Sequence, residues 1–378
     1  MHDCKCKQVQ RTWQVRCTYP QGVVNWAKFI ERKSMSLKSE IFEQPETLQR
    51  LLDTQKTHVE QIARAIRQRE IDYVFLAARG TSDHAGLYAK YLWGAFNRLP
   101  VALATPSLFS IYGKPPALKN GLVLGISQSG QSPDIVGVVA EGKRQGTPTL
   151  AITNEPDSPL AETAEFVIDI HAGAEKAVAA TKTYTAQLLA VAMLSAALAK
   201  DRDQLAMLQR VPEMMRQTLE LCTTVEQAAE RYRYMESCVV IGRGYNYATA
   251  FEIALKIKEL TYVLADPYSS ADFQHGPVAV VEHGFPVIAI VPEGQIAGEL
   301  LGFLRQLRER EAELVVISPL DEALGLAHTP LPLPVGMPEW LSPLVAVAPG
   351  QLFALGLTLA KGFDPEHPRG LRKVTLTR

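Results

Sequence analysis

The sequence contains one alternating pattern of strands and helices twice, and this repeat limits the possible folds more than any other feature. Residues 73–170 alternate short apolar runs, such as "YVFLAARG" and "GLVLGIS", with helix-like stretches. Such runs predict parallel strands in a sheet whose two faces are both covered by helices. The pattern returns after 164 residues, which aligns Arg79 with Arg243 and Gly130 with Gly294. We therefore expect two tandem doubly wound, flavodoxin-like α/β domains that arose by duplication.

The repeat divides the chain into five parts. We assign residues 1–34 to an atypical basic leader, and residues 35–200 to the first domain with its N-terminal helix. A helical linker is expected over 201–236, the second domain over 237–362, and a C-terminal tail over 363–378. The segment that starts at Met35 reads like a new N-terminus, so the leader is interpreted as a start-site artefact, with a genuine extension as the alternative.

The composition is that of a soluble globular protein, with 47% hydrophobic and 21% charged residues among 378. A formal net charge of -1 gives no electrostatic reason to expect binding to nucleic acid or to an anionic membrane. The apolar run over 188–199 is too short to span a bilayer and indicates a buried helix. The five cysteines match neither a disulfide framework nor a zinc site, which favours a reduced cytoplasmic protein without metal or cofactor.

A polar loop follows a buried strand in the first copy, where "GLVLGI" runs into "SQSGQS". Its polar side chains are Ser127, Gln128, Ser129 and Ser132. Together with backbone N–H groups at a helix N-terminus, they predict a site for a phosphate dianion, although a serine-capped turn is the ordinary alternative. Thr81 and Ser82 follow the first strand and reach the same sheet edge. In the second copy Pro292 lacks an N–H and Glu293 repels anions, so binding is expected in the first copy alone.

The segment "FEIALKIKEL" (residues 251–260) carries three charges in a narrow stripe between apolar residues. Helical spacing places Glu252, Lys256 and Glu259 within about 60° of one another. An exposed i,i+4 pair is the simple interpretation. A shielded carboxylate would instead be a stronger base, and the neighbouring lysine would hold it ionised. The stripe therefore qualifies as a proton-transfer site.

These motifs together resemble the sugar isomerase (SIS) family. The resemblance rests on "EIFEQPETL", "RGTSDHAG", "GISQSGQSPD", "AVAATKTYTAQL", "GRGYNYATAFEIALKIKELTYVLADPY", "ADFQHGPVAVV" and "HPRGLRKVTLTR", which cover residues 40–378. It is strongest toward the isomerase half of the glutamine–fructose-6-phosphate aminotransferases and toward the SIS-type glucosamine-6-phosphate deaminases.

The resemblance implies roles for individual residues. Substrate contacts are expected from Thr81, Ser82, Ser127, Gln128, Ser129, Ser132 and the backbone near Val178. Glu259 would carry a proton between C1 and C2, and His275 would open the sugar ring. Lys256 and Glu252 would support Glu259, and the tail would close over the sugar with Lys373. The resemblance also implies a homodimer in which His275 comes from the neighbouring subunit.

The sequence departs from the aminotransferases in several places. No segment resembles their glutaminase domain, and Ala180 and Arg372 stand where other residues are usual. The stretch "ADFQHGP" is more similar to the deaminase branch. We therefore expect conversion of glucosamine 6-phosphate and water to fructose 6-phosphate and ammonia. The alternatives are an aminotransferase-like isomerase, a deglycase for another amino-sugar phosphate, and a non-catalytic phosphosugar sensor. The sugar epimer and an imine at Lys373 stay open.

Overall fold

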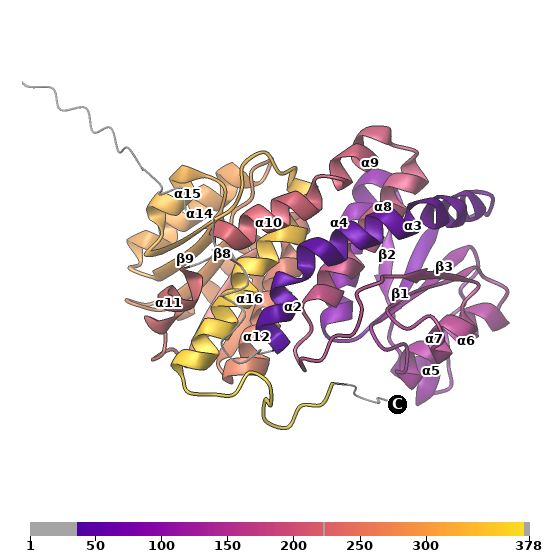
Figure 1. Cartoon of the computed structure of the whole chain (residues 1–378), viewed down its shortest axis with the longest axis horizontal. Coiled ribbons are helices and arrows are strands. Elements are labelled where there is room, and N and C mark those ends of the chain that lie inside the picture. The colour runs from indigo at the N-terminus through magenta and orange to yellow at the C-terminus, as the bar shows by residue number, and fades with distance from the viewer. Residues whose placement is uncertain (1–35, 222–223, 374–378) are drawn as a thin grey trace, which may run out of the picture. The chain divides into compact units, whose positions relative to one another are not determined.

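The computed structural model describes residues 36–221 and 224–373, and within them the chain forms two parallel five-stranded sheets (Figure 1). The predictions made for the leader lie outside these residues. The first sheet has the order β2-β1-β3-β4-β5. Its strands are β1 (Tyr73–Ala77), β2 (Val101–Leu103), β3 (Gly121–Ser127), β4 (Thr149–Thr153) and β5 (Phe166–Asp169).

Helices cover both faces of the first sheet, as the unpatterned apolar strands require. One face packs against α3 (Gln44–Arg67), α4 (Thr81–Asn97) and α8 (Lys182–Ala199). The other packs against α6 (Pro133–Arg144) and α7 (Pro159–Thr163), with the short α5 (Ser107–Ser110) alongside. The apolar run over 188–199 lies within α8, whose residues 182–197 are all buried, so the prediction of a buried helix is confirmed.

The second sheet repeats the first, with the order β10-β9-β8-β6-β7. Its strands are β6 (Ser237–Gly242), β7 (Leu264–Ser269), β8 (Pro286–Ile290), β9 (Glu313–Ser318) and β10 (Thr329–Pro332). β1 begins at residue 73 and β6 at 237, which reproduces the offset of 164 in the sequence. The prediction of two tandem doubly wound domains is confirmed.

Helices from the two copies meet in one hydrophobic core. The inner face of the second sheet packs against α12 (Tyr247–Thr261), α16 (Ser342–Ala360) and α11 (Val225–Glu230). α14 (Ala297–Glu309) and α15 (Asp321–Leu326) cover its outer face. α12 contacts α4, and α16 contacts α8, so the two copies share their inner helical layer. α9 (Arg202–Leu208), α10 (Val211–Leu221) and α11 occupy the stretch predicted as a helical linker.

Residues 339–360 form the one helical segment in the described part of the chain that is long and apolar enough to cross a membrane. The structure buries 89% of its apolar window, however. Length and composition are weak signs of a membrane span, because the central helix of a globular core passes the same test. α16 is such a core helix.

The tail after α16 runs back toward the start of the described chain (Figure 1, yellow). Glu366 accepts hydrogen bonds from the Ser36 hydroxyl and from the Leu37 N–H, at the first turn of α2 (Ser36–Phe42). The Arg369 guanidinium lies 3.7 Å from the centre of the Tyr262 ring, and its backbone N–H donates to the Tyr262 hydroxyl. These contacts fix the course of the tail up to residue 373.

The packing of α16 against α12 generates a first prediction. A Cβ atom at Gly350 would lie 2.3 Å from Cγ1 of the buried Ile253. We expect Gly350→Ala to lower the free energy of unfolding by about 1–3 kcal/mol through overpacking. Gly302→Ala is the matched control, since Gly302 lies in α14 with open space around it and alanine there favours the helix by up to about 1 kcal/mol. Urea unfolding of both variants checks this, and equal effects would contradict it.

Candidate functional site

The polar loop after β3 has a backbone that only glycine fits. Gly130 has φ +60°, and a Cβ atom there would lie 2.0 Å from the Ser158 hydroxyl oxygen. Its N–H donates to the Ser127 hydroxyl at 3.1 Å, and the N–H of Gln131 donates to the Ser129 hydroxyl at 3.3 Å. These bonds hold the serines in a tight turn at the N-terminus of α6, which suits an anion.

The loop forms one wall of a cavity of about 330 Å3 at the carboxyl edge of the first sheet. Ten of the predicted site residues line this cavity: Thr81, Ser82, Ser127, Gln128, Ser129, Ser132, Val178, Lys256, Glu259 and Lys373. They come from both copies and from the tail. Ala180 and Arg372, the positions that depart from the aminotransferases, also line it. Two predicted residues do not line the cavity. Glu252 is buried behind its wall, and His275 is exposed outside it.

The charged stripe on α12 is buried against α4. The Lys256 ammonium lies 3.3 Å from Glu252 Oε1 and 2.7 Å from Glu259 Oε2. Glu252 also accepts hydrogen bonds from the Thr81 hydroxyl at 3.1 Å and is 2.7 Å from His84 Nδ1. The side chains of Glu252 and Lys256 are 0% and 1% exposed, so the interpretation as an ordinary surface pair is wrong.

Burial and charge oppose each other within the stripe. Burial alone would raise the pKa of Glu252, but Lys256 together with the His84 and Thr81 hydrogen bonds outweighs it and lowers the pKa. Burial would likewise lower the pKa of Lys256, but the two carboxylates raise it well above its usual value. Both groups are therefore charged at neutral pH. The strongest desolvation falls on Glu252 rather than on Glu259, which has 24% of its side chain exposed at the cavity.

The Thr81 hydroxyl, on a residue that lines the cavity, is bonded to two residues of the charged stripe. It donates to Glu252, and it accepts from the Lys256 ammonium at 3.2 Å. Its hydroxyl therefore joins the first copy to the charged stripe of the second. Ser82, the next residue, faces the cavity with its oxygen 3.0 Å from the Gln187 amide nitrogen.

Sequence reasoning missed three residues of the site. Gln187 and Arg79 both line the cavity, and His84 contacts Glu252 behind it. The Arg79 guanidinium pairs with the fully buried Asp134 carboxylate at 2.8 Å, beside the polar loop. A glutamine beside the apolar run over residues 188–194 was a visible signal for Gln187. The pairs made by Arg79 and His84 join distant parts of the chain, and no local pattern marks them.

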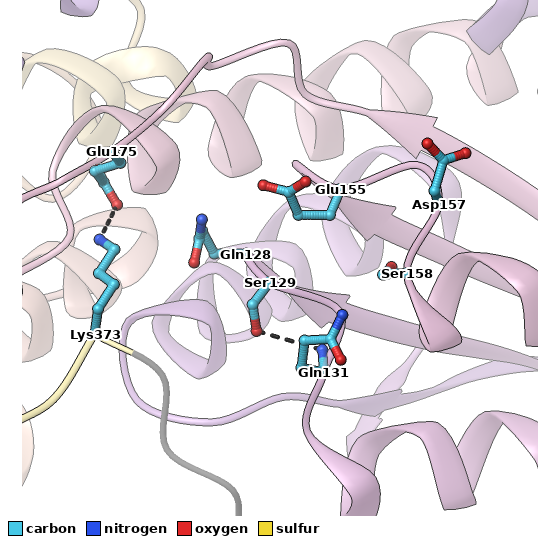
Figure 2. Close-up of a pocket in the computed structure, with 8 residues that line it drawn as sticks. All are labelled: Gln128, Ser129, Gln131, Glu155, Asp157, Ser158, Glu175 and Lys373. Carbon is cyan, nitrogen blue, oxygen red and sulfur yellow. Dashed lines mark hydrogen bonds and ion pairs between the residues drawn. The ribbon is translucent and has the colours of Figure 1, made fainter.

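The tail brings Lys373 to the mouth of the site. Its ammonium lies 2.7 Å from Glu175, whose carboxylate also accepts hydrogen bonds from Thr181 and Thr183. Figure 2 shows this pair on one side of Gln128 and Ser129, with Glu155 and Asp157 on the other. These residues line a second cavity of about 310 Å3 that adjoins the first. Lys373 therefore faces both cavities.

His275 lies at the end of α13 (Ser270–Gln274) and is exposed. It does not line either of the two cavities. Any role for His275 at this site therefore requires a second copy of the chain, as the homodimer prediction assumes. That prediction is not tested by a single chain.

The loop of the second copy that corresponds to "SQSGQS" holds a protein carboxylate. The N–H of Gln295 donates to Glu339 Oε2 at 2.7 Å. A Cβ atom at Gly294 would lie 2.2 Å from the same oxygen. Glu339 thus places a negative charge at the turn where the first copy presents its serines, which agrees with the expectation that only the first copy receives an anion.

The SIS domain model matches residues 69–197 and 216–361. The chain belongs to the SIS family. It is 34% identical over 348 residues to glutamine–fructose-6-phosphate aminotransferase (isomerizing) of Thermus thermophilus. The match covers 88% of this chain but only 57% of that SIS protein, so the chain spans little more than half of its curated relative.

Two solved structures are similar to this SIS chain. A protein from Silicibacter pomeroyi DSS-3, provisionally named a phosphosugar isomerase, is 35% identical with a TM-score of 0.79, over 87% of this chain and 99% of its own. Glucosamine-6-phosphate deaminase of Thermotoga maritima is 19% identical with a TM-score of 0.74, over 91% and 100%. The latter likeness shows the fold alone. The chain thus groups with the SIS phosphosugar isomerases.

The buried stripe predicts a large effect of removing its cation. Lys256→Met leaves the Glu252 carboxylate buried beside Thr81 and His84 without its cation. We expect the free energy of unfolding to fall by about 3–5 kcal/mol, as for other broken buried ion pairs. Lys258→Met removes an exposed lysine from the same helix and should change the free energy of unfolding by less than about 0.5 kcal/mol. Denaturant unfolding at neutral pH measures both, and a similar small loss in each would contradict the prediction.

The same stripe predicts a dependence on acid. Because folding lowers the pKa of Glu252 below its usual 4.5, the ionised carboxylate stabilises the fold fully above that pH. The stability advantage of the parent protein over Glu252→Gln should therefore be constant from pH 7 to 4.5. It should then decline as the pH falls through the lower pKa of the folded protein. Glu230→Gln, at an exposed position on α11, should show no such decline. Unfolding curves across this range provide the measurement.

Proposed function

We propose that this SIS protein converts glucosamine 6-phosphate and water to fructose 6-phosphate and ammonia. The observation that supports this most is that one cavity is lined by the serine loop after β3 and by the charged stripe on α12. A phosphate held by the loop leaves the far end of a six-carbon sugar at the stripe. We further propose a cytoplasmic location.

In the proposed reaction the loop binds and orients the substrate. Ser127, Ser129 and Ser132, the Gln128 amide and the backbone N–H groups at the start of α6 donate to the phosphate oxygens. The phosphate and the Ser82 hydroxyl then fix the sugar's position. His275 of a neighbouring subunit opens the ring by moving a proton from O1 to O5, since imidazole can both donate and accept protons near neutral pH.

Glu259 then acts as the base. Its carboxylate takes the proton from C2 of the open-chain amino aldose and returns a proton to C1. In the same conversion the C2 amino group loses a proton and the C1 carbonyl oxygen gains one, so C1 becomes a hydroxymethyl group and C2 an imine. Lys256, 2.7 Å away, orients Glu259 and offsets charge that develops on the substrate oxygen. Water adds to the imine carbon, and ammonia leaves to give the ketose. Glu252 positions Lys256, and Lys373 closes the mouth beside Glu175.

Two alternatives within the family use the same proton transfer. The first is the sugar-isomerising step of an aminotransferase, and the identity to the Thermus aminotransferase supports it. The second is deglycation of another amino-sugar phosphate, for which the serine loop would be unchanged and only the sugar pocket would differ. A non-catalytic sensor would need the serine loop but not a base and a buried cation facing the same cavity.

The test is to incubate the purified chain with glucosamine 6-phosphate in deuterated water and to follow ammonia and the sugar protons. Ammonia release with deuterium at C1 of the product supports the deaminase. Glu259→Gln should lower both rates by at least about 100-fold, the usual range for a general base, while sugar-phosphate binding remains.

The other outcomes separate the alternatives. Deuterium exchange without ammonia release would favour the isomerase part of an aminotransferase, whereas binding with neither would favour the sensor. Glu282→Gln, at an exposed position in the second copy, is the control for loss of a glutamate alone. Equal rates in the parent protein and Glu259→Gln would exclude Glu259 as the base.

A further inference from the structure

Gln187 lines the cavity and carries a buried hydrogen-bonding group that the proposed reaction does not use. It lies in α8, is 1% exposed, and lines the cavity between the two copies. Its amide nitrogen donates to the Ser82 hydroxyl oxygen at 3.0 Å. Its amide oxygen is buried and has no hydrogen-bond partner among the described residues. An unpaired buried acceptor costs about 1–3 kcal/mol of stability, and a ligand donor that reached this oxygen would recover part of that cost.

The chemistry of this oxygen limits what it can bind. Phosphate oxygens are acceptors and repel another acceptor, so the Gln187 oxygen is no phosphate ligand. The lysines of the cavity already have partners, since Lys256 contacts two carboxylates and Thr81, and Lys373 contacts Glu175. The oxygen therefore suits an O–H or N–H donor of a neutral part of the substrate. A sugar hydroxyl is such a donor.

The position of Gln187 indicates which hydroxyl this is. Gln187 is bonded to Ser82, and the adjacent Thr81 is bonded to Lys256 of the charged stripe. The serine loop after β3 lies on the same cavity, at the phosphate-binding end. With C6 at the loop and C1 and C2 at the stripe, the wall formed by Ser82 and Gln187 faces the middle carbons. This assignment of ends rests on the proposed function.

We propose that Gln187 is a specificity-determining residue that accepts a hydrogen bond from the C3 or C4 hydroxyl of the phosphosugar. Because its nitrogen is committed to Ser82, the amide oxygen is the atom of Gln187 left to accept a hydrogen bond from a substrate in the cavity that this residue lines. The Ser82 oxygen accepts that bond, which leaves its own O–H free to donate to the substrate. Gln187 and Ser82 thus present one acceptor and one donor, and a sugar with the wrong configuration at these carbons leaves the buried acceptor unpaired.

Deoxy analogues test this directly. The substrates are glucosamine 6-phosphate, its 3-deoxy and 4-deoxy analogues, and its C4 epimer galactosamine 6-phosphate. For the parent protein, loss of the hydroxyl that Gln187 reads should lower kcat/KM by about 10- to 100-fold, as expected for a buried acceptor left unpaired. In Gln187→Met, which has no acceptor of this kind, that analogue and the full substrate should react within about threefold of each other.

A matched control uses the same substitution elsewhere. Gln204 lies in α9, is buried, and also has an amide oxygen without a partner among the described residues, but it does not line either cavity. Gln204→Met should keep the discrimination of the parent protein. Dissociation constants for the same sugars, measured by calorimetry, provide a readout that does not depend on turnover. Thermal unfolding shows that both variants are folded.

The outcomes separate this inference from the proposed function. Discrimination that persists in Gln187→Met, or equal affinity of the parent protein for all four sugars, would overturn the role of Gln187 alone. Binding and discrimination without ammonia release would overturn the deaminase and leave Gln187 supported as the residue that reads the sugar. Failure to bind any of these sugar phosphates would overturn both.

Discussion

The buried cation Lys256 is the interaction on which the rest of this site depends. A lysine that is 1% exposed is tolerated because Glu252 and Glu259 lie on either side of it along α12. Glu252 also accepts a hydrogen bond from Thr81 and contacts His84, both in α4, so its buried oxygens have all their partners only when the two copies pack together. The same contact places Glu259 at the cavity. Stability of the interface and arrangement of the site therefore have one physical origin.

Duplication gives the two copies one fold and allows them different tasks. The first copy supplies the serine loop, with Gly130 in a left-handed backbone conformation and its N–H bonded to the Ser127 hydroxyl. The second copy fills its corresponding turn with Glu339 and instead contributes the charged helix. The cavity is lined by the serine loop on one side and by the charged stripe on the other. In the proposed reaction the loop binds the phosphate and the stripe transfers the proton. Neither copy alone contains both surfaces.

The strands, the charged stripe and the serine loop were predictable because each depends on residues that are close together in the chain. Apolar runs between helices predicted the strands, and helical spacing placed Glu252, Lys256 and Glu259 on one stripe. The loop "SQSGQS" was recognisable because its donors are adjacent in the chain. Gln187, His84 and the Arg79–Asp134 pair were missed, because their roles arise from contacts between residues 50 or more positions apart. Spacing along α12 likewise did not show which carboxylate of the stripe is covered by α4, and this is Glu252, whereas Glu259 keeps 24% of its side chain exposed.

The sequence by itself determined the two parallel sheets, their equivalence, and which turn carries the serine loop. These depend on hydrophobic periodicity and on the backbone donors of a few neighbouring residues. The tertiary structure decided which charges are buried, which copy lies opposite the serine loop, and where the tail carries Lys373. The reason is that burial and ion pairing are properties of an environment assembled from distant segments. The sequence shows which side chains are ionisable. The free energy of burying a charged side chain, and therefore its pKa, depends on the groups that surround it in the folded protein.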